Sequence, residues 1–294
     1  MDQEQIRTVL AVERYGSFTL AADMLHVTQS TVTARIRHLE RELGVAIWER
    51  TTRRLVLTSE GKKLMALFER VDNLFERMRG VADSSGFARH VVFGSVHSQW
   101  SSGILPLLRA WAEQQPSVTW RLITGHSREL IEWVRDGSLD AAITYFPAHE
   151  HGLLSELLAE QPLRLLGASI LGLPDGSPLT TDQVKQHRLA YVEWGAPFTE
   201  WYRQEFDGWI PAIQVDQAPL LVQLLTNGGY LGFMPAALAR TALNQGVLSE
   251  VPYLSETPLP ARSVHLISSE RALARPMVRD LWSHVLERGS SAFL

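Results

Sequence analysis

The chain of 294 residues contains no cysteine. This absence excludes disulfides, metal sites built on thiolates and redox sensing by thiols. The chain also has no run of about eighteen apolar residues, and its first residues lack the pattern of a signal peptide. Glycine-rich nucleotide motifs and the G-x-S-x-G motif of hydrolases are missing too. We therefore expect a soluble, cytoplasmic protein with no membrane partner that is not an enzyme.

One cluster of histidines raises the question of a metal site. His149, Glu150 and His151 are consecutive, so the histidines cannot form the i, i+4 pair of a helical zinc site. Pro147 and Gly152 flank the triplet, which favours an exposed loop. We expect no catalytic residue, no metal and no cofactor.

Positive charge is concentrated in one short stretch. Residues 1–60 contain eight arginines and no lysine, against eight acidic residues, so this part of the chain is neutral in total. That balance argues against indiscriminate binding of polyanions and against an architectural DNA-binding protein. Residues 29–58, however, hold six of these arginines and only three glutamates. The charge balance therefore indicates a local basic surface.

The same stretch has the pattern of a helix-turn-helix followed by a basic hairpin. Ser17 and Thr28 each precede a helical pattern and can cap its first turn, and Gly44 ends the second. An apolar stripe marks the buried face of that second helix: Val32, Ile36, Leu39 and Leu43. From residue 47 to 58 the pattern is typical of strands. A helix that enters the major groove beside a wing has this form.

The outward face of this helix carries side chains suited to DNA. Glutamine can bond adenine through two hydrogen bonds, hydroxyls suit bases or phosphates, and arginine suits guanine or phosphate. We predict contacts from the helix and from the hairpin, namely Thr28, Gln29, Ser30, Thr31, Thr33, Arg35, Arg37, Arg50, Arg53 and Arg54. The alternative is that the motif never meets DNA and that the charged face is simply solvated.

The motif resembles the N-terminal signature of LysR-type transcriptional regulators. The resemblance is dense and without gaps, and is carried by Ser17, Phe18, Ala21, Ala22, Leu25, Val27, Gln29, Ser30, Val32, Leu39, Glu40, Leu43, Gly44, Arg50, Leu57, Thr58 and Gly61. It implies sequence-specific binding of double-stranded DNA. Many family members carry arginine where this chain has Ala34, so the bases read near that point do not transfer.

Residues 59–86 continue as an amphipathic helix ending near a hinge at 84–86. Its apolar seam alternates spacings of three and four, which suits pairing with a second chain. We predict dimerisation through Leu64, Leu67, Val71, Leu74 and Met78, with Phe68 and Phe75 widening the seam. The alternative is a helix packed on its own domain. The resemblance implies a homo-oligomer, a dimer or a dimer of dimers.

Residues 87–294 alternate strand and helix patterns, which indicates α/β lobes with parallel sheets. We predict strands at 91–96, 118–124, 141–146, 189–194, 212–216, 229–235 and 264–268, and helices at 101–115, 128–136, 197–206, 219–227 and 276–288. Residues 157–169 are a candidate crossover between lobes. The expected fold is therefore an N-terminal winged helix-turn-helix (1–58), a linker helix (59–86) and an α/β sensor domain. That sensor (87–294) resembles periplasmic binding proteins, with lobe I at about 90–160 and 266–294 and lobe II at about 161–265.

Ligands of open α/β sheets bind beyond the carboxyl ends of the strands. This rule selects the polar and aromatic residues Ser98, Gln99, Ser101, Ser102, Thr124, Gly125, Tyr145, Phe146, Glu193, Trp194, Gln217 and Gly229. The resemblance implies a small organic effector, often an acid, in a cleft lined by such positions. The alternative is that the serines and threonines are ordinary helix caps.

We therefore predict a transcriptional regulator that joins a DNA reader to a small-molecule sensor. The resemblance implies an interrupted inverted repeat at promoters as the target and RNA polymerase as a partner. A free-standing solute-binding protein leaves the first 86 residues unexplained. A regulator of the same architecture without a small-molecule effector, controlled by a protein partner or by its abundance, remains the alternative.

Overall fold

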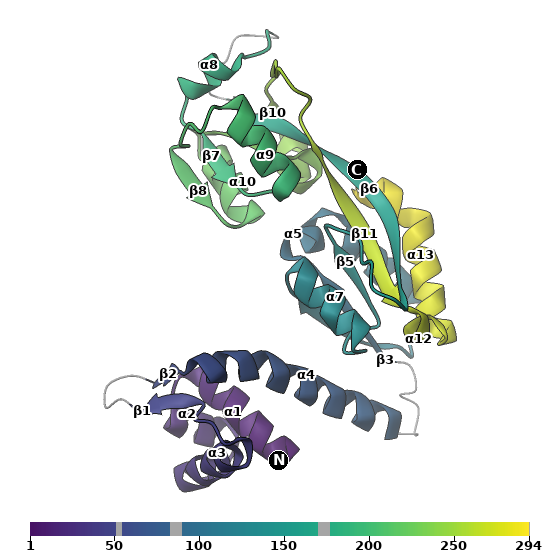
Figure 1. Cartoon of the computed structure of the whole chain (residues 1–294). Coiled ribbons are helices and arrows are strands. Elements are labelled where there is room, and N and C mark those ends of the chain that lie inside the picture. The colour runs from purple at the N-terminus through teal and green to yellow at the C-terminus, as the bar shows by residue number, and fades with distance from the viewer. Residues whose placement is uncertain (51–54, 83–89, 170–176, 294) are drawn as a thin grey trace. The chain divides into compact units, whose positions relative to one another are not determined.

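A computed structural model of the chain describes residues 1–50, 55–82, 90–169 and 177–293 (Figure 1). These residues form two compact units, Met1–His90 and Val91–Leu294. Two of the predicted DNA contacts, Arg53 and Arg54, and the predicted hinge at 84–86 lie outside the described residues. The side chains of Arg50 and Ser101 lie outside them as well.

The first unit is a winged helix-turn-helix followed by a long helix. Its elements are α1 (Gln3–Tyr15), α2 (Phe18–Met24), α3 (Gln29–Leu43), β1 (Trp48–Arg50), β2 (Leu55–Leu57) and α4 (Ser59–Ala82). The capping predictions are confirmed, because the Ser17 hydroxyl accepts from the Leu20 amide and the Thr28 hydroxyl from the Thr31 amide. The helix α1, which the sequence analysis did not identify, begins with a capping box at Asp2.

The core of this unit joins the helix-turn-helix to α4. Val32, Ile36 and Leu39 of α3 are buried, as their spacing predicts. Phe68 of α4 is buried in the same cluster, with Phe75 partly buried against it. The small wing is antiparallel, with Glu49 opposite Val56. One face of α4 therefore belongs to the core of the first unit.

The second unit alternates strands and helices. Its first part comprises β3 (His90–Ser95), α5 (His97–Gln99), a π-helical turn η1 (Trp100–Ile104), α6 (Leu105–Gln114), β4 (Thr119–Thr124), α7 (Ser127–Arg135), β5 (Ala141–Thr144) and β6 (Leu153–Ala168). There follow α8 (Thr181–Lys185), β7 (Ala190–Val192), α9 (Ala196–Glu205), β8 (Ile213–Val215), α10 (Ala218–Thr226) and β9 (Leu231–Pro235). The last elements are η3 (Ala236–Ala239), α11 (Arg240–Asn244), β10 (Leu248–Glu250), β11 (Ala261–Ser269), α12 (Glu270–Leu273) and α13 (Pro276–Phe293).

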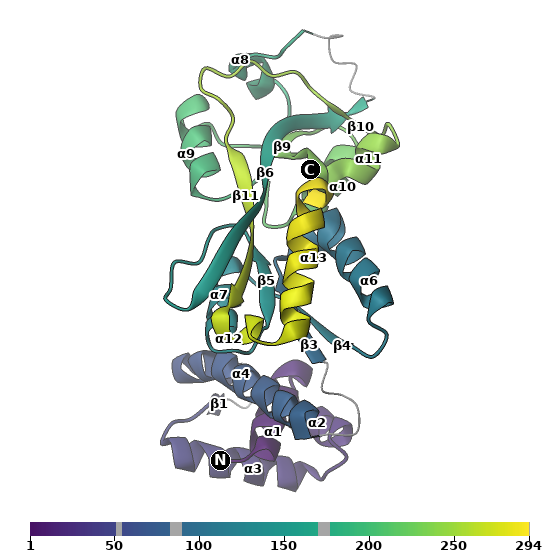
Figure 2. The same ribbon diagram turned by 90° about the vertical axis from the view of Figure 1, so that its right-hand side faces the viewer.

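Two lobes with separate cores share two long strands. Lobe I is built around Phe93 and Trp111 and includes Leu281 of α13, which packs beside α6 (Figure 2). Lobe II is built around the aromatic residues Trp201, Phe206 and Phe233. The strands β6 and β11 pair with one another and run from one lobe into the other (Figures 1 and 2).

The main sheet differs from the parallel arrangement that we expected. The pairs β3–β5 and β7–β8 are parallel, but β6 and β11 are antiparallel to each other, and β11 is antiparallel to β5. The predicted crossover at 157–169 is one continuous strand, β6, that enters both cores through Leu158 and Leu163. The alternation of strand and helix patterns in the sequence predicts the order of the elements. It does not predict the direction in which a strand such as β6 or β11 runs between the lobes.

Candidate functional site

The start of α3 presents polar side chains outward. Thr28, Gln29 and Ser30 are exposed, and Thr31 and Thr33 are half-buried. The Thr28 hydroxyl lies 2.8 Å from the hydroxyls of both Ser30 and Thr31 and accepts from the Thr31 amide at 3.2 Å. The Thr33 hydroxyl donates to the Gln29 carbonyl at 3.0 Å. This turn is therefore ordered by its own hydroxyls and leaves the Gln29 amide exposed.

The two predicted arginines of α3 lie in different surroundings. The guanidinium of Arg35 forms an ion pair with Glu4 of α1 and donates to the Thr8 hydroxyl at 3.5 Å. Arg37 is exposed. Of the two, Arg37 is therefore the more accessible cation.

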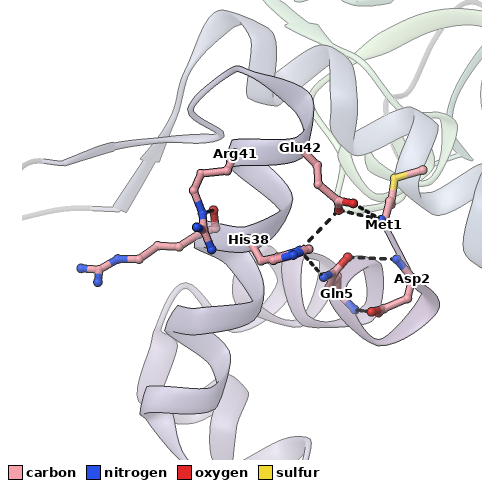
Figure 3. A network of polar contacts seen from close by, with 7 residues as sticks. Met1, Asp2, Gln5, His38, Arg41 and Glu42 are labelled. Carbon is pink, nitrogen blue, oxygen red and sulfur yellow. Dashed lines mark hydrogen bonds and ion pairs between the residues drawn. The ribbon is translucent and has the colours of Figure 1, made fainter.

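The C-terminal half of α3 is bound to the start of α1 by a polar network (Figure 3). The Gln5 amide lies 2.8 Å from Nδ1 of His38, and that nitrogen lies 3.4 Å from the Glu42 carboxylate. The Met1 amino group pairs with the same carboxylate at 2.6 Å. The hydrogen bond from this ammonium is the main cause that lowers the pKa of Glu42. His38, at the margin of the predicted DNA face, therefore holds α3 against α1.

Two residues of the signature anchor the wing. The Glu40 carboxylate accepts the Ile47 amide at 2.8 Å, and the Ile47 carbonyl accepts the Thr58 amide at 3.0 Å. Gly61 is buried where an added Cβ would overlap that carbonyl oxygen. The wing therefore takes its position from α3 on one side and from the start of α4 on the other.

The predicted dimerisation seam divides into two faces. Leu64 and Val71 pack against the core of the first unit. Leu67, Leu74 and Met78 are exposed by 47%, 39% and 56% of their surface. The phenylalanines that we expected to widen the seam belong to the buried face. The exposed apolar stripe is therefore narrower than the sequence suggests.

In the second unit, several predicted effector residues meet in one hydrogen-bonded cluster. The Gln99 amide donates to the Tyr145 hydroxyl at 3.1 Å and to Oε1 of Gln161 at 2.9 Å. Ser98 bonds the same Tyr145 hydroxyl, and Ser102 donates to the Gln99 side chain. Gln99, Ser102 and Gln161 are buried. The cluster brings the turn after β3 and the end of β5 to the middle of β6.

Arg262 of β11 connects this cluster to lobe II. It is the cross-strand partner of Gln161. Its guanidinium carbon lies 3.2 Å from the ring centroid of Tyr145 and 5.1 Å from that of Trp194. Trp194 belongs to the lobe II core and donates its indole N–H to the Phe233 carbonyl at 2.6 Å. A cation thus lies within reach of one aromatic ring from each lobe.

The other predicted effector positions whose side chains are described are not joined to this cluster by the hydrogen bonds given above. The Thr124 hydroxyl accepts the Trp100 indole N–H at 2.8 Å, and Gly125 packs closely under the ring of Trp133. Four further residues are exposed: Phe146, Glu193, Gln217 and Gly229. The strand-end rule therefore predicts a larger set of residues than the hydrogen-bonded cluster contains.

The sequence analysis missed Gln161 and Arg262. Gln161 lies between Glu160 and Pro162, and Arg262 precedes the predicted strand at 264–268, so neither stands out as a polar residue within an apolar pattern. Their pairing depends on the register of β6 with β11, strands separated by about a hundred residues of chain. A local pattern does not contain that register.

These two units match the two halves of one regulator family. Residues 3–62 match the family described as "Bacterial regulatory helix-turn-helix protein, lysR family", and residues 84–290 match the "LysR substrate binding domain". The chain belongs to the LysR family and is a DNA-binding transcriptional regulator with a substrate-binding domain. The resemblance given by the signature is thereby confirmed.

Named relatives agree with this assignment. The chain is 29% identical over 238 residues to the HTH-type transcriptional regulator HdfR of Yersinia pestis (strain Pestoides F), covering 80% of this chain and 81% of the relative. The same figures hold for HdfR of Yersinia pseudotuberculosis serotype O:1b (strain IP 31758).

Solved structures share the fold. CbnR, a LysR family transcriptional regulator, matches with a TM-score of 0.74 and 21% identity over 99% of both chains. Full-length CbnR in complex with its target DNA matches with a TM-score of 0.71 and 20% identity, over 98% of this chain and 99% of that one.

In the described part of this chain, no helix is long and apolar enough to span a bilayer.

Proposed function

We propose that this regulator reads a specific operator through the start of α3 and responds to a small organic effector bound in its second unit. The main support for DNA reading is the exposed turn Thr28–Gln29–Ser30, which is capped by its own hydroxyl. Its side chains are accessible to a partner, while the apolar face of α3 is buried. In this proposal residues 1–58 read DNA, residues 59–86 link two chains and residues 87–294 sense the effector.

The hydrogen-bonded cluster around Gln99 and Tyr145 supports the sensor, because it lies where both lobes share β6 and β11. A ligand bound there can shift the equilibrium between two arrangements of the lobes only by the difference between its affinities for those arrangements. The regulator works in the cytoplasm as a homo-oligomer, acts on an interrupted inverted repeat, contacts RNA polymerase and has no enzymatic activity. Control by a protein partner instead of an effector is the second candidate.

Footprinting tests the proposal as a whole. The purified full-length protein is placed on the DNA upstream of its own gene, with and without a metabolite pool. We expect a protected inverted repeat whose pattern changes with the metabolites. A footprint that does not change when metabolites are added contradicts the proposed control by an effector. Failure to protect any sequence in a genome-wide site selection contradicts the proposed reading of DNA by α3.

The role of Gln29 has its own test. We expect Gln29→Ala to weaken binding to the specific site by ~1–3 kcal/mol and to leave binding to random DNA nearly unchanged, because a lost base contact removes discrimination only. Titrations on both DNAs at one fixed salt concentration measure the difference. Glu13→Ala, at an exposed position of α1 outside the predicted contacts, is the control. Equal losses on both DNAs exclude base reading by Gln29.

A further inference from the structure

We propose a second ligand site in the second unit, a pocket of lobe I that binds a small zwitterion such as a free α-amino acid. The pocket lies where the end of α7, the start of β6 and the junction of β11 with α12 meet. In lobe I this is the end away from lobe II (Figures 1 and 2). The site is separate from the proposed effector region and does not depend on it.

The register of the sheet separates this pocket from the cluster around Gln99 and Tyr145. Ser268 pairs with Ala141 at the start of β5, and the next residue, Ser269, lines the pocket. Tyr145 directly follows the end of the same strand. Four residues of strand at about 3.3 Å each span roughly 13 Å. One small ligand therefore cannot occupy both places.

The size of the pocket suits a small metabolite. Its volume is about 240 Å³. One water occupies ~30 Å³ of the liquid, so this space equals that of about eight waters. Gly152 lines the pocket without a side chain, and a Cβ added there would meet no described atom within 4 Å. His151, from the histidine triplet of the sequence, lines it too. A polar molecule of amino-acid size therefore fits.

Charges of both signs line this pocket without neutralising one another. Arg135 of α7 is exposed, and so are Arg271 and Glu270 of α12. Among the described residues, these three side chains form no hydrogen bond or ion pair. Arg121 and Arg128 are exposed without such a contact as well, but neither lines this pocket. What distinguishes the site is the meeting of two such arginines and a glutamate from distant segments in one hollow.

The backbone on both sides of the pocket is held in place. The Asp136 carboxylate, at the end of α7, accepts the Ser138 amide at 2.8 Å. The Glu270 amide donates to the Gly152 carbonyl at 3.0 Å and so joins the start of α12 to the start of β6. The segments that carry the charged side chains are therefore fixed to one another before a ligand arrives, which lowers the entropy lost on binding.

The mixture of charges selects the class of ligand. An inorganic anion such as phosphate meets two guanidinium groups but also the carboxylates of Asp136 and Glu270. A simple cation meets the same conflict in reverse. A zwitterion matches both signs, because its carboxylate binds a guanidinium fork while its ammonium binds a carboxylate. Exposed ion pairs contribute little each, so we expect affinities in the millimolar range.

The first experiment tests the ligand class on the full-length protein. Each of the common L-amino acids is titrated by calorimetry and by the rise in melting temperature, which grows with ligand concentration over Kd. We expect at least one to bind with a Kd in the millimolar range or below. Its N-acetyl derivative and its amide each lack one of the two charges, so we expect both to bind at least tenfold more weakly. Inorganic phosphate at the same concentration tests for a simple anion site.

Variants of equal charge change assign the binding to the pocket. We expect Arg135→Gln, Arg271→Gln and Glu270→Gln each to weaken amino-acid binding at least tenfold. The controls are Arg128→Gln and Glu132→Gln, at exposed positions of α7 that do not line the pocket. They change the net charge by the same amount and should keep full binding. Circular dichroism and the melting temperature without ligand show that each variant is folded.

Each contrary result has a distinct meaning. Failure of every amino acid to bind, or equal binding of an amino acid and its two derivatives, overturns the zwitterion site. Binding that the three pocket variants retain in full places the ligand elsewhere and overturns the pocket. Binding of phosphate alone makes the pocket an anion site. The footprinting described above decides the proposed regulation separately, because an operator footprint that responds to metabolites in Arg271→Gln does not require this pocket.

Discussion

At the scale of single residues, several members of the DNA-binding signature serve the fold of the reader. Glu40 holds the Ile47 amide, and Gly61 lies against the Ile47 carbonyl. Gln29 and Ser30, by contrast, are exposed. We therefore expect substitutions of the first kind to change stability and substitutions of the exposed residues to change DNA affinity.

Gly61 gives the clearest stability prediction at this scale. A Cβ at this position overlaps the carbonyl oxygen of Ile47 and approaches the Thr58 hydroxyl to 3.1 Å. Backbone cannot yield as a flexible side chain does, so we expect Gly61→Ala to lower the free energy of unfolding by roughly 1–3 kcal/mol. Urea unfolding followed by circular dichroism measures it, with Lys63→Ala at an exposed site of α4 as control. Wild-type stability of the Gly61 variant contradicts the packing argument.

At the scale of elements, α4 has one buried face and one exposed apolar stripe. Phe68 is 3% exposed, whereas Leu67, Leu74 and Met78 are exposed by more than a third. Residues 67, 74 and 78 are spaced by seven and four, so they share one side of a helix. The proposed pairing of two chains therefore depends on this stripe.

The stripe predicts a change in self-association. We expect Leu67→Asp combined with Leu74→Asp to weaken self-association at least tenfold, because two charges enter an apolar contact. The fold should persist, since both side chains are exposed in the single chain. Sedimentation equilibrium gives the association constant, with Lys63→Asp as the control on the same helix. Unchanged association places the contact elsewhere.

Prediction from sequence succeeded for elements whose pattern is local. Caps at Ser17 and Thr28 and the buried stripe of α3 follow from spacing alone. Residues 157–169 are predicted to cross between the lobes, and β6 does enter both cores, but its antiparallel pairing with β11 depends on a partner distant in the sequence. Tyr145 and Gln99 were selected by the strand-end rule, but Arg262 reaches them through pairing with β6, which is a tertiary property.

At the scale of the whole molecule, the chain has separate cores in its two units. The first unit packs around α1, α3 and α4, and the second around the two lobes. Cores that share no residues can unfold separately. We therefore expect two thermal transitions.

Paired core deletions test this expectation. Phe68→Ala should lower the stability of the first unit by about 3–5 kcal/mol, because a buried phenylalanine leaves a cavity. Phe206→Ala, in the core of lobe II, should do the same to the second unit. Scanning calorimetry should show a different transition moving in each variant. One joint transition that both variants shift equally shows that the units unfold together.

The cores of the two lobes of the second unit are distributed differently along the chain. Lobe II takes its core from a continuous part of the chain, from Leu163 to Leu259. Lobe I begins earlier but needs Leu266 of β11 and Leu281 and Val285 of α13. On a ribosome, where chains fold as they emerge, the later lobe in the sequence can close first. The core of the lobe that begins at β3 is therefore complete only after α13 has emerged, whereas the core of lobe II needs nothing beyond Leu259.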